Sequence, residues 1–163
     1  MKFVGFGHVP SRRDQIRMSD EELRAFLAEQ MIVSCATVGP SGRPHLVPLW
    51  YVPDGTELRG WTYAKSQKAR NLERDPRATL QVEDGVQYHE LRGAMLECDV
   101  EVEHDAERVA GFGLELFTRY AGGGELPPET RAAVEQQASK RVGLRFVPTR
   151  VVSWDHAKLG GVY

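Results

Sequence analysis

The segment from Lys65 to Arg77 gathers cations around the predicted start of a helix. In a chain of net charge −2, its basic residues outnumber its acidic ones: Lys65, Lys68, Arg70, Arg74 and Arg77 against Glu73 and Asp75. Ser66 is a predicted N-cap, so free backbone N–H groups point outward beside Lys68. Because such N–H groups and a lysine together favour a phosphate, the sequence predicts an anion site here. Thr62, at the end of the preceding strand, adds a hydroxyl. A solvated basic helix is the alternative.

Other catalytic or metal-binding patterns are absent from the sequence. There is no glycine-rich GK[ST] run and no GxGxxG stretch at a strand-to-helix turn. The histidines form no i, i+4 pair and no HExxH motif, so we expect no metal site: His8, His45, His89, His104 and His156. No side-chain set for nucleophilic catalysis stands out, and either His45 or His156 is a candidate proton donor. Cys35 and Cys98 lie in strand-like runs and are interpreted as buried thiols.

The composition is that of one globular domain spanning residues 1–163. Hydrophobic residues make up 41% and charged residues 27% of the chain, which suffices for a single core without disulfides. The net charge of −2 gives no general attraction to nucleic acid or anionic lipid. No apolar run reaches the roughly 18 residues that span a bilayer. The first residues, MKFVGFGHVPSRRD, lack a signal-peptide pattern, so we expect a cytoplasmic protein without a membrane partner.

Hydrophobic periodicity and turn residues divide the chain into strands and helices. Predicted strands cover Ile32–Val38, His45–Val52, Glu57–Tyr63, Arg77–Glu83, Tyr88–Glu103, Arg141–Pro148 and Arg150–Trp154. Predicted helices cover Ser19–Gln30, Ser66–Arg74, a segment from Asp105 to the glycine triplet, and Pro127–Lys140. Residues 1–18 are expected to be irregular. The short connections favour antiparallel pairing, and many short antiparallel strands avoid exposed edges by closing. We therefore expect a mainly β fold, a small antiparallel β-barrel with flanking helices.

Two of these strands carry unusual faces. The strand His45–Val52 is apolar on both faces, which predicts that it covers something besides the core. Pro48 is expected to break the ladder, while Trp50 and Tyr51 offer flat apolar area. A planar heteroaromatic ligand with a phosphate would suit such a strand beside the anion site, and a subunit interface is the competing explanation. Along residues 94–103, acidic side chains alternate with apolar ones, and this acidic face is interpreted as solvated.

Four stretches of the sequence resemble the pyridoxamine 5′-phosphate oxidase-like group: TVGPSGRPHLVPLWYV, TYAKSQKARNLERDP, RATLQVEDGVQY and ELRGAMLECDVEV. This group consists of FMN-binding split β-barrels, and it includes flavin/deazaflavin oxidoreductases that use the 8-hydroxy-5-deazaflavin coenzyme F-420. The resemblance covers Ser19–Val102 well and the closing strands more loosely. It implies an antiparallel split β-barrel that forms a homodimer, with two cofactor sites at the interface.

The resemblance also implies which residues bind the cofactor. Lys68 matches the lysine that binds the phosphate. Thr62 and Tyr63 match the strand end at the ribityl–phosphate portion, and Val47–Trp50 match the strand along the ring system. The implied cofactor-binding residues are Val47, Pro48, Leu49, Trp50, Thr62, Tyr63, Lys65, Ser66, Gln67, Lys68 and Arg70. Asn71 matches a residue that orients the helix. The tail SWDHAKLGGVY does not match the arginine- and histidine-bearing segment of pyridoxamine phosphate oxidases proper, so vitamin B6 oxidation is not expected.

These observations lead to one principal function and two alternatives. The principal expectation is an oxidoreductase that transfers a hydride between bound F-420 or FMN and a small unsaturated substrate. The surplus cations favour the deazaflavin, whose anionic tail is longer: Lys65, Arg70, Arg74 and Arg77. A non-catalytic flavin or tetrapyrrole (heme-type) binding or carrier protein is the first alternative. A single-strand nucleic-acid module is the second, and the acidic strand Glu97–Glu103 argues against it.

Overall fold

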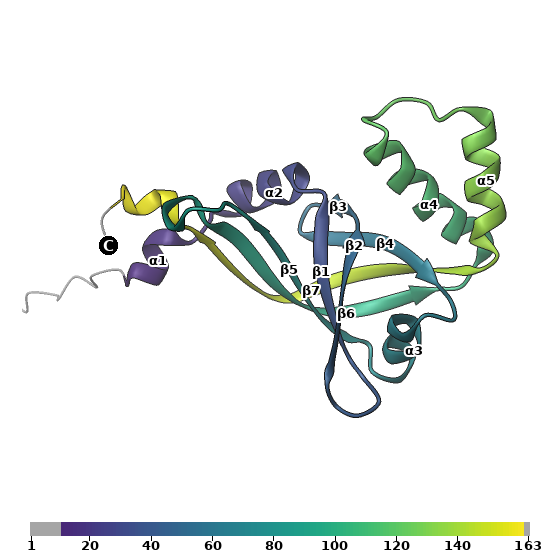
Figure 1. Ribbon diagram of the computed structural model, residues 1–163, viewed down its shortest axis with the longest axis horizontal. Coiled ribbons are helices and arrows are strands. Elements are labelled where there is room, and N and C mark those ends of the chain that lie inside the picture. Colours follow the sequence, from purple (N-terminus) through teal and green to yellow (C-terminus); the bar gives the residue numbers. More distant parts are fainter. Residues whose placement is uncertain (1–10, 162–163) are drawn as a thin grey trace, which may run out of the picture.

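One antiparallel sheet forms the centre of the computed structural model, which describes residues 11–161 (Figure 1). Its strands lie in the order β2-β1-β5-β6-β7-β4-β3. Their bounds are β1 Ile32–Val38, β2 Pro44–Trp50, β3 Val52–Asp54, β4 Glu57–Tyr63, β5 Arg77–Asp84, β6 Arg92–Glu103 and β7 Arg141–Asp155. The sheet curls strongly, since a Cβ added to Gly60 on β4 would lie 3.1 Å from the carbonyl oxygen of Trp50 on β2. The predicted mainly β, antiparallel split barrel with flanking helices is confirmed.

Helices flank this sheet along its length. They are α1 Arg12–Ile16, α2 Asp20–Glu29, α3 Gln67–Arg74, α4 Ala106–Tyr120 and α5 Pro128–Ala138, with 3₁₀ turns η1 Tyr88–Glu90 and η2 His156–Leu159. The hydroxyls of Ser19 and Ser66 cap α2 and α3, as the sequence predicts. The expectation of an irregular segment 1–18 is wrong for α1, because Ser11 forms a capping box there too. The rest of that prediction, residues 1–10, lies outside the described residues.

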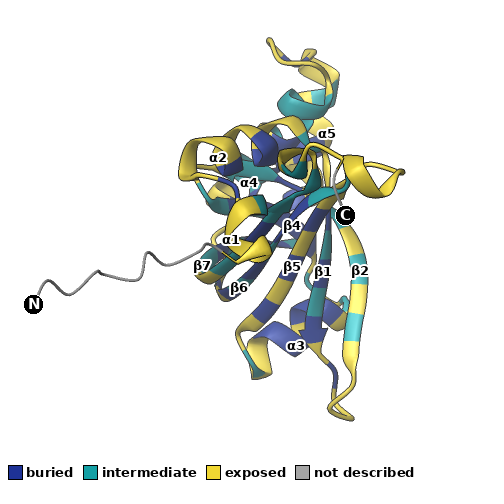
Figure 2. Cartoon of the chain, turned by 90° about the vertical axis from the view of Figure 1, so that its left-hand side faces the viewer, coloured by how far each residue is buried: buried dark blue, intermediate teal, exposed yellow. Residues whose placement is uncertain are grey.

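The hydrophobic core divides into two clusters. The main cluster fills the inner side of the curled sheet beneath α2 and α3; its fully buried members include Leu27, Val33, Leu58, Leu80, Leu96 and Leu144. A smaller cluster lies between β4 and the helices α4 and α5, around Trp61, Val109, Leu116 and Val134. A Cβ at Gly113 would clash with the Trp61 ring, so α4 lies very close to β4. Figure 2 shows the resulting alternation of buried and exposed residues along β5.

The predicted strand His45–Val52 is two strands in the structure. β2 ends at Trp50 and β3 begins at Val52, and Tyr51 between them is fully buried. Its hydroxyl donates to the Leu27 carbonyl at 2.7 Å. Strand periodicity does not reveal this anchor, since Leu27 lies on a different element, α2.

The position of β2 at the edge of the sheet overturns two expectations. Its ladder with β1 continues through the pair Ser34–Pro48, so the predicted break at Pro48 is wrong. On an edge strand the missing N–H of a proline can face away from the neighbouring strand. The strand is also not buried on both faces: Leu46 is 66% and Trp50 49% exposed on its outer face. This outer face is apolar and largely uncovered in the single chain.

The second half of the sheet departs from the prediction at its turns. The residues expected to open the strand Tyr88–Glu103 form η1 instead, and the two predicted closing strands are the single strand β7. The β6–β7 register shifts between Glu97 and Cys98, which leaves Thr149 as an extra residue on β7. Such a bulge bends a strand without ending it, so a local Pro-Thr signal is not a strand boundary here.

The acidic face of β6 is exposed and paired with arginines. The pairs are Glu97–Arg150 at 2.9 Å, Glu101–Arg145 at 2.9 Å and Glu103–Arg108 at 3.2 Å. Arg150 and Arg145 come from the neighbouring strand β7, so these ion pairs run across the β6–β7 ladder. Arginines of the same chain thus pair with three of the four carboxylates on this face, and Asp99 is exposed without an ion pair among the described residues.

Candidate functional site

Helix α3 begins directly beside the end of β4. The Thr62 and Ser66 hydroxyl oxygens lie 3.3 Å apart, and the Ser66 N–H donates to the Tyr63 carbonyl at 2.9 Å. The Ala64 N–H donates to the Lys140 carbonyl at 3.0 Å, which ties this turn to the start of β7. The predicted residues Thr62, Tyr63 and Ser66 therefore share one braced turn at a helix N-terminus, where backbone N–H groups lack intrahelical partners.

Lys68 is a buried cation without a partner. It is only 5% exposed, and its amine makes no hydrogen bond or ion pair within residues 11–161. Burial lowers the pKa of Lys68, and the Cys35 thiol is the titratable group that acts on it. An unpaired buried ammonium is costly. A bound anion would give this amine the partner that residues 11–161 do not provide.

A second unpartnered group lies on the inner side of the sheet. His45 Nδ1 is buried and has no hydrogen-bond partner among the described residues. His45 pairs with Thr37 across the β1–β2 ladder, and the Thr37 hydroxyl accepts a hydrogen bond from the Asn71 side chain at 3.0 Å. Asn71 is fully buried, one helical turn after Lys68. Asn71 thus docks α3 on β1, the orienting role expected of it, and turns the face with Lys68 toward the side of the sheet with His45.

The predicted ring-facing residues alternate between the two faces of β2. Val47 and Leu49 are half-buried on the inner face, which also carries His45. Pro48 and Trp50 are exposed on the outer face. Because β2 pairs only with β1, its other backbone edge is free to hydrogen-bond a ligand. The structure therefore turns only the side chains of Val47 and Leu49 to the inner side, and along an antiparallel edge strand only alternate residues direct their backbone polar groups to the unpaired edge.

The remaining predicted residues lie on the solvent side of α3. Lys65 and Arg70 are exposed and have no hydrogen-bond or ion-pair partner in the part of the chain that the structure describes. Gln67 is exposed as well, and its side-chain amide donates to Asn71 Oδ1 at 2.8 Å. Lys65 and Arg70 are thus free to meet an anion outside the buried position of Lys68.

Two cations of the same segment are already engaged. Arg74 donates to the Val38 carbonyl at 2.6 Å, and Arg77 forms an ion pair with Asp75 at 2.7 Å. The expectation that both are surplus cations for an anionic tail is therefore corrected, because the fold uses them to hold the β1–β2 hairpin and the end of α3.

A cavity of about 650 Å³ lies beside the cap of α3. It is lined by Tyr63, Ala64, Lys65, Ser66, Ser139 and Lys140. The Arg141 guanidinium lies 4.3 Å from the Trp61 ring and 4.0 Å from the Tyr63 ring. Sequence reasoning missed Lys140 and Arg141, because they reach the site through the β4–β7 pairing of Tyr63 with Arg141. No local pattern signals that pairing.

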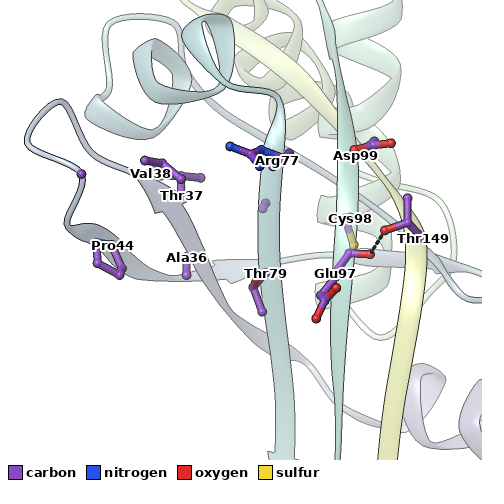
Figure 3. A pocket seen from close by; sticks show the side chains of 12 residues that line it. Ala36, Thr37, Val38, Pro44, Arg77, Thr79, Glu97, Cys98, Asp99 and Thr149 are labelled. Carbon is purple, nitrogen blue, oxygen red and sulfur yellow. Dashed lines mark hydrogen bonds between the residues drawn. The ribbon is translucent and has the colours of Figure 1, made fainter.

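A second cavity, of about 380 Å³, lies where the β1–β2 hairpin borders β5 and β6 (Figure 3). Arg77, Thr79, Glu97 and Asp99 line it, and the Thr149 hydroxyl donates to the Glu97 carbonyl at 3.0 Å. None of the predicted cofactor-binding residues lines this cavity. Thr37, which accepts the hydrogen bond from Asn71, does line it, so this hollow borders the contact that docks α3 on β1.

The other candidate groups are placed away from α3 or are chemically quiet. His156 lies in η2, which contacts α1 and η1 at the far end of the sheet (Figure 1). Burial raises the pKa of the Cys35 thiol to about 11 and that of Cys98 to about 12, so both are inert at neutral pH, as predicted. Within residues 11–161 no three His, Cys, Asp or Glu side chains gather around a potential metal position. No helix in this range has the length and apolarity to cross a bilayer.

Comparison with known proteins identifies the family. The family model described as Pyridoxamine 5'-phosphate oxidase matches residues 19–155, and the chain belongs to this family. A solved structure of the conserved hypothetical protein Rv2991 from Mycobacterium tuberculosis is 41% identical, with a TM-score of 0.84 over 94% of this chain and 95% of that one. No curated protein matched the sequence.

Two further solved structures share the fold. An F-420 reductase is 27% identical, with a TM-score of 0.61 over 78% of this chain and 94% of that one. HutZ, the heme storage protein from Vibrio cholerae, is 18% identical, with a TM-score of 0.63 over 82% of this chain and 93% of that one. The likeness to HutZ shows the fold alone, so the split barrel by itself does not select between a reductase and a carrier.

The residues present fit a phosphate-bearing cofactor. A phosphate requires cationic and N–H donors that the chain has not already used. The Lys68 amine and the N–H groups of Gln67 and Lys68 are such donors, whereas the Ala69 N–H already bonds the Ser66 hydroxyl at 3.2 Å. The Ser66 and Thr62 hydroxyls lie beside them. The buried, unpartnered Nδ1 of His45 adds a polar atom on the same side of the sheet.

Proposed function

We propose that this protein is an oxidoreductase that binds the deazaflavin coenzyme F-420 or FMN and transfers a hydride between it and a small unsaturated substrate. The observation that carries this proposal is Lys68 at the start of α3, a residue only 5% exposed whose amine has no partner among the described residues. The F-420 reductase, at 27% identity, supports it. When bound, such a cofactor accepts and donates the hydride, so the protein needs no nucleophile or metal of its own.

The residues of the chain bind and orient the cofactor. Lys68 and the N–H groups of α3 hold the phosphate, with the Thr62 and Ser66 hydroxyls beside it. The free backbone edge of β2 from Val47 to Trp50 lies along the planar ring and fixes its angle. Val47 and Leu49 give that ring an apolar, water-poor surface on the inner side of the sheet.

The solvent side of α3 favours the deazaflavin over FMN. FMN ends at its phosphate, whereas the deazaflavin continues into a longer anionic tail. Beyond the cap of α3 lie the cavity of about 650 Å³ and the unpaired cations Lys65 and Arg70. A tail with carboxylates would occupy this region and gain ion pairs there, while FMN would leave it empty.

The outer face of the β1–β2 hairpin supports a homodimer as part of this proposal. Ile32 is 56%, Leu46 66% and Trp50 49% exposed, and all three lie on one face, since Ile32 pairs with Trp50 and Leu46 with Ala36. Contiguous exposed apolar surface of this kind marks an association site. A second copy of the chain would cover this apolar surface and bury the outer face of β2.

A fluorescence titration of the purified protein with FMN and with F-420 tests the proposal. We expect tight, saturable binding of F-420 and weaker binding of FMN, followed by turnover of reduced cofactor with an enone or a redox dye. Binding of a cofactor without turnover of any acceptor would favour the non-catalytic binding protein. Binding of neither cofactor would overturn the proposal.

A further inference from the structure

The C-terminal end of α4 contacts the end of α2 and the place where β1 begins and β2 ends. Arg119 donates hydrogen bonds to the carbonyls of Ala28 at 2.8 Å and Gln30 at 2.7 Å, at the end of α2. Its guanidinium also lies 5.4 Å from the Tyr51 ring. The next residue, Tyr120, contacts the start of β1 and the end of β2. Arg119 and Tyr120 therefore both contact the chain at the end of β2, the strand proposed to lie along the cofactor ring.

The Tyr120 hydroxyl bridges the β1–β2 ladder at its last position. The final pair of that ladder is Ile32–Trp50, so Met31 and Tyr51 are next in register. The Tyr51 N–H donates to the Tyr120 hydroxyl at 3.1 Å, and that hydroxyl donates to the Met31 carbonyl. One phenol thus gives partners to backbone groups of both strands where the chain turns inward at Tyr51.

The Tyr120 ring fixes the side chain at the end of the same strand. It stacks on the Trp50 indole with ring centroids 4.0 Å apart and an interplanar angle of 11°. Stacked aromatic pairs gain energy beyond the area that they bury. Trp50 is therefore held from one side by a helix that follows it by more than fifty residues in the sequence.

We propose that Tyr120 is a positioning residue for the cofactor ring, acting through the backbone of β2. The inference rests on the proposed function, in which the β2 edge from Val47 to Trp50 orients the ring. That edge has no further strand beside it, so its geometry depends on β1 and on whatever fixes its end. Tyr120 fixes that end through two hydrogen bonds and one stack. Tyr120 contacts the end of β2 and not the turn at Ser66, where the phosphate is proposed to bind.

The separation between the strand end and the phosphate turn gives a specific test. Cofactor affinity is measured by fluorescence for FMN and for riboflavin, which has the same ring and ribityl chain but no phosphate, and for F-420 and its phosphate-free chromophore. Tyr120→Phe keeps the stack and removes the hydroxyl. We expect it to raise Kd for the phosphate-bearing and phosphate-free probes by the same factor, about three- to tenfold. Lys68→Ala should raise Kd for the phosphate-bearing probes alone.

Tyr88→Phe is the matched control, because it removes a tyrosine hydroxyl from η1, on the connection between β5 and β6. It should leave every Kd unchanged. Tyr120→Leu, which also removes the stack, should exceed the effect of Tyr120→Phe and change the absorption spectrum of the bound ring. A loss of thermal stability in Tyr120→Phe with wild-type Kd values would show a structural role only and overturn the inference.

The outcomes for the two proposals are distinguishable. If wild-type protein binds the probes and Tyr120→Phe weakens only the phosphate-bearing ones, Tyr120 acts at the phosphate end and the inference is overturned while the proposed function stands. If wild-type protein binds no probe, the proposed function fails and this role for Tyr120 fails with it.

Discussion

Two regions of this chain stand out in the sequence by their charge, one acidic and one basic, and the structure treats those charges differently. The acidic face of β6 is exposed, and three of its carboxylates are paired with arginines of the same chain. Lys68 on α3 is buried and unpaired within the described residues. An exposed, balanced charge costs the fold little, whereas a buried, unbalanced one destabilises it unless a ligand arrives. The proposed function therefore places the ligand where the described residues leave a charge unsatisfied, not where charges are most numerous.

The largest expected effect follows from removing the unsatisfied charge. Lys68→Ala should raise the Kd of a phosphate-bearing cofactor by about ten- to a hundredfold, because a charged hydrogen bond to a phosphate is lost. The free protein should keep its stability or gain some, since the unpaired ammonium favours the unfolded state. Titration calorimetry and thermal unfolding measure the two quantities on the same sample.

Lys65→Ala is the matched control for that variant. It removes a cation from the same turn, but an exposed one. It should leave FMN binding nearly unchanged and weaken only the binding of a cofactor with an anionic tail. Equal losses of FMN affinity in Lys65→Ala and Lys68→Ala would show that burial of Lys68 has no special role.

A second prediction concerns Asn71, which docks the helix that carries Lys68 on β1. Asn71→Leu should lower the free energy of unfolding by about 1–3 kcal/mol, because the buried Thr37 hydroxyl loses the partner it has at 3.0 Å. Cofactor affinity should fall as well, since α3 then lacks its fixed contact with β1. Urea unfolding gives the first value and cofactor titration the second. Thr37→Val removes the partner hydroxyl instead, and a double-mutant cycle that shows no coupling between the two sites would contradict the docking role.

Much of this fold could be predicted from the sequence, because its signals are local. The bounds of β1 and β4 match the predicted Ile32–Val38 and Glu57–Tyr63, and Ser19 and Ser66 cap helices where their spacing indicates. The predictions fail where a contact with a residue far away in the sequence determines the local structure. Tyr51, between β2 and β3, is held by a hydrogen bond from its hydroxyl to Leu27 on α2, and β7 passes its proline because a bulge at Thr149 absorbs the mismatch with β6.

The candidate site divides in the same way. The turn at Ser66 lies within one short segment, so the residue types and their spacing are enough to predict it as an anion site. The burial of Lys68, the unpartnered His45 Nδ1 and the cavity beside Lys140 arise from pairing between distant strands. The engagement of Arg74 could not be foreseen either, because its partner Val38 is 36 residues away, whereas Arg77 pairs with Asp75 only two residues away. Composition reveals which charged residues are present, and only tertiary contacts reveal which of them are already paired with other groups of the same chain.

A third prediction uses pH to isolate the buried amine. The pKa of Lys68 in the free folded protein lies below its ordinary value near 10.5, so between these two pKa values the unfolded chain binds more protons and stability rises with pH. Cys35, Cys98 and Tyr51 have pKa values raised by burial, and their contribution has the opposite sign. Lys68→Met retains all three. The stability of wild type relative to Lys68→Met should therefore increase as pH rises toward 10.5, as measured by urea unfolding, and a pH-independent difference would be evidence against an unpaired amine.

The smallest effect is expected on the balanced face. Arg150→Ala removes one partner of the Glu97–Arg150 pair, whose side chains are 43% and 60% exposed. Water replaces the lost arginine at such a site, so the free energy of unfolding should fall by about 0–1 kcal/mol and the change should vanish at high salt. The Kd of the cofactor should equal that of wild type, because Arg150 lies on β7 away from the turn at Ser66. An equal loss of cofactor affinity in Arg150→Ala and in Lys68→Ala would mean that Arg150 also contributes to ligand binding. The exposure of a charged side chain would then not distinguish residues that bind the ligand from residues that do not.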